Sequence, residues 1–159
     1  MKQVLFFAAA ALAAPLAIAT AGVTTAAPIY VGVEGENIAV GGYDTLSYFQ
    51  GNGAPVKGDA RFTVEYDGAE WHFSSQENAD KFKEDPDAYA PQYGGHCAWA
   101  MARGSLAPGD PTVYKVVDGK LYLNFNKQVQ ETWLKDIPGF ISKANIAWSE
   151  LPEDARFGG

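Results

Sequence analysis

Cysteine is almost absent from this sequence: Cys97 is the only one among 159 residues, and His72 and His96 are the only histidines. A single cysteine excludes an internal disulfide. The thiol must therefore be buried, bound to a ligand, paired with another chain or chemically reactive. Its position is informative, because it lies beside His96 in the segment YGGHCAWAM, directly after two glycines.

Positive charge is also scarce, with 12 lysines and arginines against 19 aspartates and glutamates and a formal net charge of −7. An acidic chain without a basic run is a poor nucleic-acid binder, so we expect no nucleic-acid partner. The sequence also lacks a phosphate-binding loop, a hydrolase nucleophile elbow and a zinc-protease motif. No pair of carboxylates is placed to act as acid and base across a substrate. An enzyme is therefore the less favoured class, although these absences leave it open.

The N-terminus has the pattern of a secretory signal peptide. Lys2 precedes the apolar run VLFFAAAALAAPLAIA, which is shorter than a comfortable membrane span. Small residues at Ala19 and Ala21 fit a cleavage site, so we expect residues 1–21 to be removed and the mature chain to begin at Gly22. The protein would then be periplasmic or secreted, with no stable membrane span after cleavage. An uncleaved anchor helix is the alternative.

Two segments predict antiparallel hairpins with the same turn. RFTVEYDGAEWHF alternates around Asp67-Gly68, and TVYKVVDGKLYLNF alternates around Asp118-Gly119. Asp-Gly between alternating runs is a strong signal for a two-residue hairpin. In the first hairpin His72 falls on the polar face, opposite to the face of Trp71.

A helix is expected after each hairpin. The first would begin with a capping box at Ser74 and Glu77 and end at Asp85-Pro86, where a one-turn successor begins. A shift of 51 positions aligns the two hairpin–helix segments, which indicates an internal repeat. The aligned pairs are Asp67-Gly68 with Asp118-Gly119, Trp71 with Tyr122, Phe82 with Trp133, Asp85 with Asp136, and Tyr89 with Phe140. The apolar strand faces slip by one residue between the copies, so two unrelated hairpin–helix units are the alternative.

These elements predict an α+β fold, in which a small antiparallel sheet is built from two Asp-Gly hairpins, each followed by a short helix. Asp44 is expected to cap a short helix that ends at Gly51. A C-terminal helix is expected to place Ala144 on its apolar face. The chain divides into a signal peptide at residues 1–21, an N-terminal extension at 22–38, one folded domain at 39–150 and a tail at 151–159.

Three stretches carry a family resemblance: GGYDTLSYF, the long segment from VKGDARF to GGHCAWA, and VDGKLYLNF. Together they resemble an exported bacterial YHS-domain protein over residues 39–148. The resemblance implies metal handling, usually of copper, because YHS domains also occur in heavy-metal transport ATPases. The family also includes selenoprotein variants, which implies chalcogen chemistry at a position that the resemblance does not identify here.

One departure limits what the resemblance implies. The metal-associated YHS modules carry cysteines in the second strand and the following helix, in a pattern similar to F-C-S-x-x-C. Here the segment is FSSQEN, with Ser74 and Asn78 where thiols would stand. A hydroxyl and an amide are poor ligands for a soft metal, so a metal role cannot be transferred to these two positions.

The remaining candidate site is GGHCAWAM. Gly94-Gly95 would turn the chain into a helix near His96, with Cys97 in its first turn, where a helix dipole favours the thiolate. Met101 follows one turn later on the same face. Thiolate, thioether and imidazole form a metal-ligand set suited to Cu(I), with His96 or His72 supplying the nitrogen.

Three interpretations of function stay open. In the first, the chain is a non-enzymatic metal-binding module, with copper as the candidate cofactor and a metal ion or an envelope protein as partner. In the second, it is a thiol-dependent redox protein that uses Cys97. In the third, it is a structural partner-binding domain. A structural Cys97 buried in the core, with Met101 as core filler, fits the same segment. His72 and His96 would then be hydrogen-bonded side chains without a ligand.

Overall fold

The computed structural model describes residues 37–152. The predicted signal peptide with its cleavage site lies outside these residues, as do most of the predicted N-terminal extension and C-terminal tail. Across residues 37–152, no helix combines the length and the apolar character that crossing a membrane requires.

The described residues form an α+β fold of short helices and two-stranded antiparallel sheets, as predicted. The sheets are β1–β2, β3–β4 and β5–β6, so each Asp-Gly hairpin forms a sheet of its own rather than part of a common one. With η for a 3-10 helix, the elements are η1 (Ala39–Gly42), β1 (Tyr43–Asp44), η2 (Thr45–Phe49), β2 (Val56–Lys57), β3 (Asp59–Tyr66), β4 (Ala69–Phe73), α1 (Gln76–Glu84), α2 (Pro86–Tyr89), η3 (Gln92–Gly95), α3 (Ala98–Met101), β5 (Asp110–Val117), β6 (Lys120–Asn124), α4 (Lys127–Trp133), η4 (Leu134–Asp136) and α5 (Ile137–Ser149).

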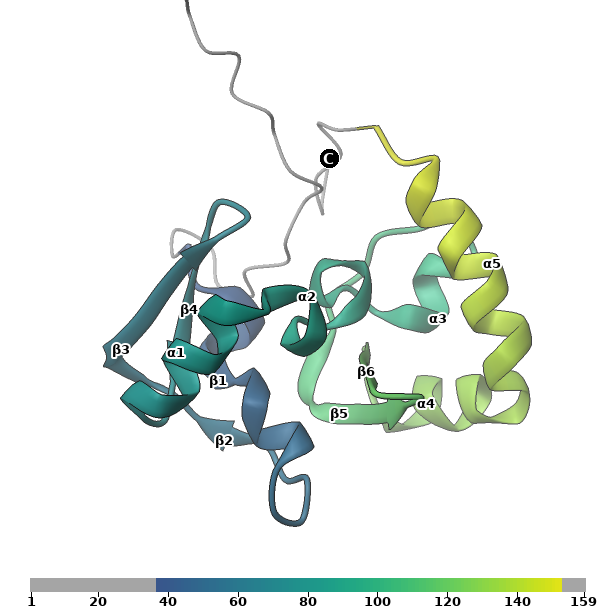
Figure 1. Ribbon diagram of the computed structural model, residues 1–159. Coiled ribbons are helices and arrows are strands. Elements are labelled where there is room, and N and C mark those ends of the chain that lie inside the picture. Colours follow the sequence, from purple (N-terminus) through teal and green to yellow (C-terminus); the bar gives the residue numbers. More distant parts are fainter. Residues whose placement is uncertain (1–36, 153–159) are drawn as a thin grey trace, which may run out of the picture.

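Figure 1 shows these elements in two groups that lie side by side. One group, in blue and teal, contains β1 to β4 and α1, and the other, in green and yellow, contains β5, β6 and α3 to α5. Helix α2 lies between the two groups in this view. We call residues 39–89 the first repeat and residues 92–149 the second repeat.

The two hairpins turn as their sequences predict. Asp67 and Gly68 have φ angles of 49° and 74°, and Asp118 and Gly119 have φ angles of 50° and 74°. Positive φ at both central residues is the mark of a type I′ turn, whose twist matches that of the flanking strands. Asp-Gly suits this turn because aspartate tolerates the left-handed region and glycine enters it without steric cost.

Strand pairing is the same in both hairpins. The Cα pairs that flank the bulge are Asp59–Phe73 and Thr63–His72 in the first hairpin, and Asp110–Asn124 and Tyr114–Leu123 in the second. Each residue of the second set lies 51 positions after its counterpart, and helices α4 and α5 begin 51 positions after α1 and α2. The predicted internal repeat is therefore confirmed in strand pairing and in helix placement.

A glycine in front of each hairpin lets the chain pass close to the hairpin's second strand. A Cβ on Gly58 would lie 2.7 Å from the Cβ of His72, and a Cβ on Gly109 would lie 2.8 Å from the Cβ of Leu123. These distances are too short for two carbon atoms, so only glycine fits at either position. The two glycines are repeat equivalents, and so are the two residues that they approach.

The hairpins differ in how many of their faces are buried. Each packs one aromatic ring against a ring of its own helix: Trp71 on Phe82, with centroids 4.9 Å apart, and Tyr122 on Trp133, with centroids 5.6 Å apart. On the opposite face the first hairpin carries Glu70 and His72, whereas Leu121 and Leu123 of the second join the core of the first repeat. The predicted slip of the apolar faces is therefore confirmed, because Leu121 and Leu123 share their face with Tyr114 and Val116. The register is the same, and β6 is apolar on both faces because it lies between two cores.

The predicted capping box at the start of α1 is displaced by one residue. Ser75 is the N-cap, and its hydroxyl accepts a hydrogen bond from the backbone N–H of Asn78 at 3.2 Å. Ser74, the predicted cap, instead donates its hydroxyl hydrogen to the carboxylate of Asp44 at 2.6 Å. Ser74 does not cap the helix because a buried anion lies within its reach.

Candidate functional site

Cys97 is fully buried and stands at the N-cap of α3. Its backbone N–H donates to the carbonyl of Ala107 at 2.9 Å, and its main chain forms a bridge with Leu123 of β6. Met101 is also fully buried, and its backbone N–H donates to the carbonyl of Cys97 at 3.0 Å, one turn away. The predicted helix is therefore present, but it is a single turn, and Cys97 precedes its first residue instead of lying inside it.

His96 is buried beside Cys97, with its imidazole bonded to the backbone. Its Nδ1 lies 2.9 Å from the carbonyl oxygen of Tyr93, which can only accept, so Nδ1 carries the proton and Nε2 holds the lone pair. Burial lowers the pKa of the imidazole. The ring centroid lies 6.2 Å from that of Trp148 on α5. At neutral pH His96 is therefore a neutral imidazole whose basic nitrogen is Nε2.

His72 lies on β4 in the first repeat, whereas the other three predicted ligands lie at η3 and α3 in the second. Figure 1 shows β4 and α3 in different groups of elements. Nε2 of His72 is 2.6 Å from Oε1 of Glu70. Within residues 37–152, histidine, cysteine, aspartate and glutamate side chains form no group of three that could hold a metal. The structure thus gathers Cys97, Met101 and His96 around η3 and α3, and the role of all four residues as metal ligands stays a prediction.

The sequence does not reveal a buried polar cluster around Asp44. The Asp44 carboxylate is fully buried, and its Oδ1 accepts from the N–H of Leu46 at 2.9 Å, which is the predicted helix cap. Its Oδ2 accepts from the N–H of Ser74 at 2.9 Å, the hydroxyl of Ser74 at 2.6 Å and Nδ2 of Asn78 at 2.7 Å. Ser74 and Asn78 are the two positions at which the family resemblance implies thiols in the metal-associated modules. Here they donate to an anion, so this cluster does not fit a soft metal.

Asp44 and Cys97 occupy equivalent places in the two repeats. Val40 and Tyr93 have φ angles of 52° and 58°, and two further residues with positive φ, both glycines, follow each of them. Each left-handed turn leads into two residues outside the helical region, Tyr43 and Asp44 or His96 and Cys97, and then into a short helix. Asp44 and Cys97 are the second of these residues in their repeats, and each stands at the N-cap of the helix that follows. Cys97 therefore takes the place in the second repeat that a buried carboxylate takes in the first.

A cleft of about 420 Å³ opens between the repeats. Its walls include Tyr66, Asp67 and Asp87 from the first repeat and Tyr93, Lys120 and Trp148 from the second. Asp87 accepts from the hydroxyl of Tyr66 at 2.7 Å, and burial together with the Asp87 charge raises the pKa of Asp67. The cleft adjoins the Cys97 segment through Tyr93, whose carbonyl binds His96.

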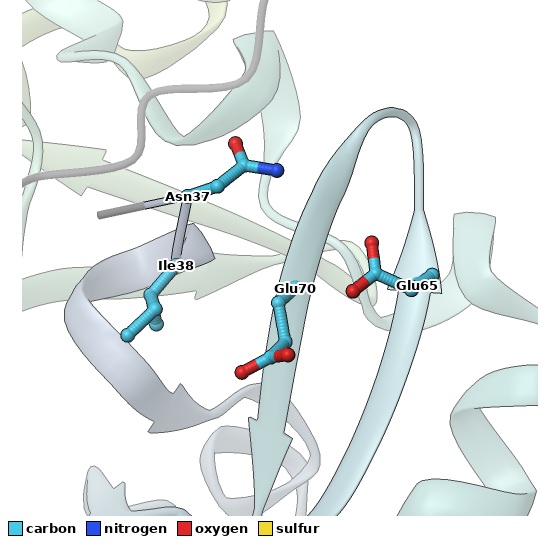
Figure 2. Close-up of a pocket in the computed structure, with 4 residues that line it drawn as sticks. All are labelled: Asn37, Ile38, Glu65 and Glu70. Atoms are coloured by element: carbon cyan, nitrogen blue, oxygen red, sulfur yellow. The ribbon is translucent and has the colours of Figure 1, made fainter. Parts of the chain in front are cut away.

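A second hollow, of about 330 Å³, lies beside the first hairpin. Figure 2 shows the carboxylates of Glu65 and Glu70 on neighbouring strands, next to Asn37 and Ile38. Glu65 and Glu70 are cross-strand partners, so two like charges lie opposite each other, which is unfavourable in a hairpin. The imidazole of His72 contacts Glu70, with Nε2 2.6 Å from Oε1. The hollow therefore marks an acidic face whose equivalent in the second repeat is apolar and buried.

Comparison with known proteins relates the first repeat to a family. Residues 51–93 match the family model of the YHS domain. A YHS domain is present in this chain. Neither the curated proteins nor the solved structures contain a match.

The YHS family is associated with metal handling, and the matched segment contains the first hairpin, α1 and α2. Ser74 and Asn78 lie inside this segment, whereas His96, Cys97 and Met101 follow its end. The family match therefore covers Ser74 and Asn78, two donors to Asp44, but not Asp44 itself.

Proposed function

We propose that this chain is a non-enzymatic metal-binding module that binds a soft ion, Cu(I), through the sulfur atoms of Cys97 and Met101. The observation that carries the proposal is the burial of both side chains one turn apart at α3. Thiolate and thioether are ligand types that select Cu(I). The YHS domain supports the same class of function, because its family is associated with metal handling.

His96 is the nitrogen ligand that this proposal favours. Metal-binding histidines commonly donate their other ring N–H to a backbone carbonyl, which sets the tautomer. His96 has this arrangement, since Nδ1 donates to Tyr93 and Nε2 is the basic nitrogen. The donor types therefore fit a soft metal in the second repeat, whereas those of Ser74 and Asn78 in the first repeat do not.

Titration of Cu(I) against a chromophoric chelator under anaerobic conditions tests the proposal. We expect Cys97→Ser to abolish binding, and we expect Met101→Leu, which preserves volume, to weaken it with little loss of stability. His96→Gln tests the nitrogen ligand, and His72→Gln is its matched control, because His72 lies in the other repeat. A wild-type protein that binds no Cu(I) contradicts the proposal. A loss of affinity in His72→Gln as large as in Cys97→Ser contradicts the proposed site.

A thiol-dependent redox protein is the second candidate, and the equivalence of Cys97 with Asp44 favours it. The first repeat supplies two backbone N–H groups to an anion at this position. By position in the repeat, the equivalent N–H groups belong to Trp99 and Phe125, although the Cys97 side chain accepts no capping hydrogen bond in the structure. Alkylation of Cys97 by iodoacetamide at neutral pH tests this candidate. Resistance of the folded protein to alkylation, together with rapid reaction in urea, would rule it out.

We also propose that the chain is exported and acts in the periplasm or outside the cell, where an envelope protein would deliver or accept the ion. The support is the N-terminal sequence, with its apolar run and the small residues before Gly22. Mass spectrometry of the protein from its native compartment should find a chain that begins at Gly22. A chain that retains Met1 contradicts export by cleavage. A chain that begins at Pro28 would show that cleavage occurs after Ala27 instead of after Ala21.

A further inference from the structure

A buried amide and a buried indole in the second repeat have no hydrogen-bond partner among the described residues. Asn124 at the end of β6 and Trp133 at the end of α4 are each 0% exposed. Within residues 37–152, the two polar atoms of the Asn124 carboxamide and Nε1 of Trp133 have no partner. Unpaired buried polar groups are costly and rare in native proteins. These groups therefore call for a partner that residues 37–152 do not supply.

The repeat places these two side chains next to each other. Their equivalents in the first repeat are Phe73 and Phe82, whose ring centroids are 5.0 Å apart. In the second repeat the same strand and helix face each other, because Tyr122 of β6 packs on Trp133. Asn124 lies two residues after Tyr122 and so on the same face of the strand. From this equivalence we infer that the amide and the indole border a common space, because a carboxamide is smaller than the phenyl ring that packs on Phe82 in the first repeat.

We propose that this space is a binding site for a neutral, polar molecule of the size of water, and that water is its ordinary occupant. The bound molecule accepts from Nε1 of Trp133 and exchanges hydrogen bonds with Asn124, whose amide offers two donors and one acceptor oxygen. Buried waters typically make about three hydrogen bonds to otherwise unpaired groups, and these two side chains supply that number. The first repeat has no counterpart, because Phe73 and Phe82 pack on each other there.

Water-selective nuclear Overhauser spectroscopy on the ¹⁵N-labelled wild-type protein tests the proposal. Trp71 is a matched control, because its equally buried indole donates from Nε1 to the carbonyl of Tyr66 at 2.9 Å. We expect cross-peaks to long-lived water at Nε1–H of Trp133 and at the Asn124 amide, and none at Trp71. Absence of these cross-peaks overturns the proposal. A crystal structure in which the space is empty, or in which Asn124 bonds directly to protein groups, does the same.

The substitution Asn124→Leu gives a second test with opposite expected signs. Leucine has a similar volume but cannot bind water, so Nε1 of Trp133 loses its partner and the unfolding equilibrium constant rises about tenfold. If the carboxamide is instead dry and unpaired, the same substitution removes a cost, and the unfolding constant falls. A fall in that constant therefore refutes the proposal. The Overhauser measurement needs no variant and decides the question even where Asn124→Leu folds poorly.

Discussion

The buried carboxylate of Asp44 ties three segments of the first repeat together, and its removal tests how much this contributes to stability. Asp44→Ala removes the acceptor of four hydrogen bonds, from Leu46, Ser74 and Asn78. A hydrogen bond to a charged group contributes about 1.5–3 kcal/mol, and a buried donor left unpaired costs about 1–3 kcal/mol. The four bonds share one carboxylate, so their contributions do not add. We expect a loss of about 3–5 kcal/mol in the free energy of unfolding.

Urea unfolding followed by tryptophan fluorescence measures this loss, because Trp71 lies in the same core. Asp44→Asn keeps the size of the side chain but presents an amide to the Ser74 donors, so an intermediate loss of about 1–3 kcal/mol is expected. The control is Asp80→Ala, whose exposed carboxylate accepts from Gln76 at 2.9 Å, with an expected change below about 0.5 kcal/mol. A loss below about 1 kcal/mol in Asp44→Ala, with an unchanged denaturant slope, would refute the structural role of the cluster.

Three further predictions concern the repeat and its charges. Gly109→Ala should lower the free energy of unfolding by about 3 kcal/mol or more in a thermal melt, because a Cβ there collides with β6. Asp67→Asn should raise stability by less than about 1 kcal/mol at neutral pH, because burial and a neighbouring carboxylate raise the pKa of Asp67 in the folded state. This gain should vanish at acidic pH, where Asp67 is protonated in both states, and Asp118→Asn measures the turn preference alone. The hydrogen bonds of Arg61 lower the pKa of Asp59 from 3.8 to about 2, so this stabilisation is present above pH 3.8 and is lost as the pH falls through 2. An NMR titration should give that midpoint, and Arg61→Gln should return it toward 3.8.

The features that the sequence predicts correctly depend on signals within a few residues. Asp67-Gly68 carries its own turn geometry, and Asp85 with Pro86 caps a helix that begins at the next residue. Ala144 lies on the buried face of α5, as its spacing predicts. Such local signals are sufficient because the residues that satisfy them are neighbours in the chain.

The features that the sequence does not predict depend on contacts between distant segments. Ser74 and Ser75 are both chemically able to cap α1, and only the approach of Asp44, 30 residues away from Ser74, assigns Ser75 to the cap. The second apolar face of β6 has the same origin, because nothing near Leu121 in the sequence indicates that the first repeat covers it. Among the candidate ligands, the sequence spacing alone predicts that Met101 lies one turn after Cys97. That His72 lies in the other repeat from Cys97 follows only from the fold.

The two repeats share a backbone and differ in chemistry, and this difference argues for where binding takes place. In the first repeat Asp44 accepts from Ser74 and Asn78. Among residues 37–152, one buried side-chain polar atom without a partner lies in the first repeat, on Thr45, and three lie in the second, on Asn124 and Trp133. In the second repeat the equivalent N-cap position holds Cys97, whose side chain accepts no capping hydrogen bond. The amide of Asn124 nearby has no partner among residues 37–152. A site that binds an exogenous group needs unused bonding capacity, so the second repeat is the half of the molecule to examine for function, although the YHS match falls almost entirely on the first.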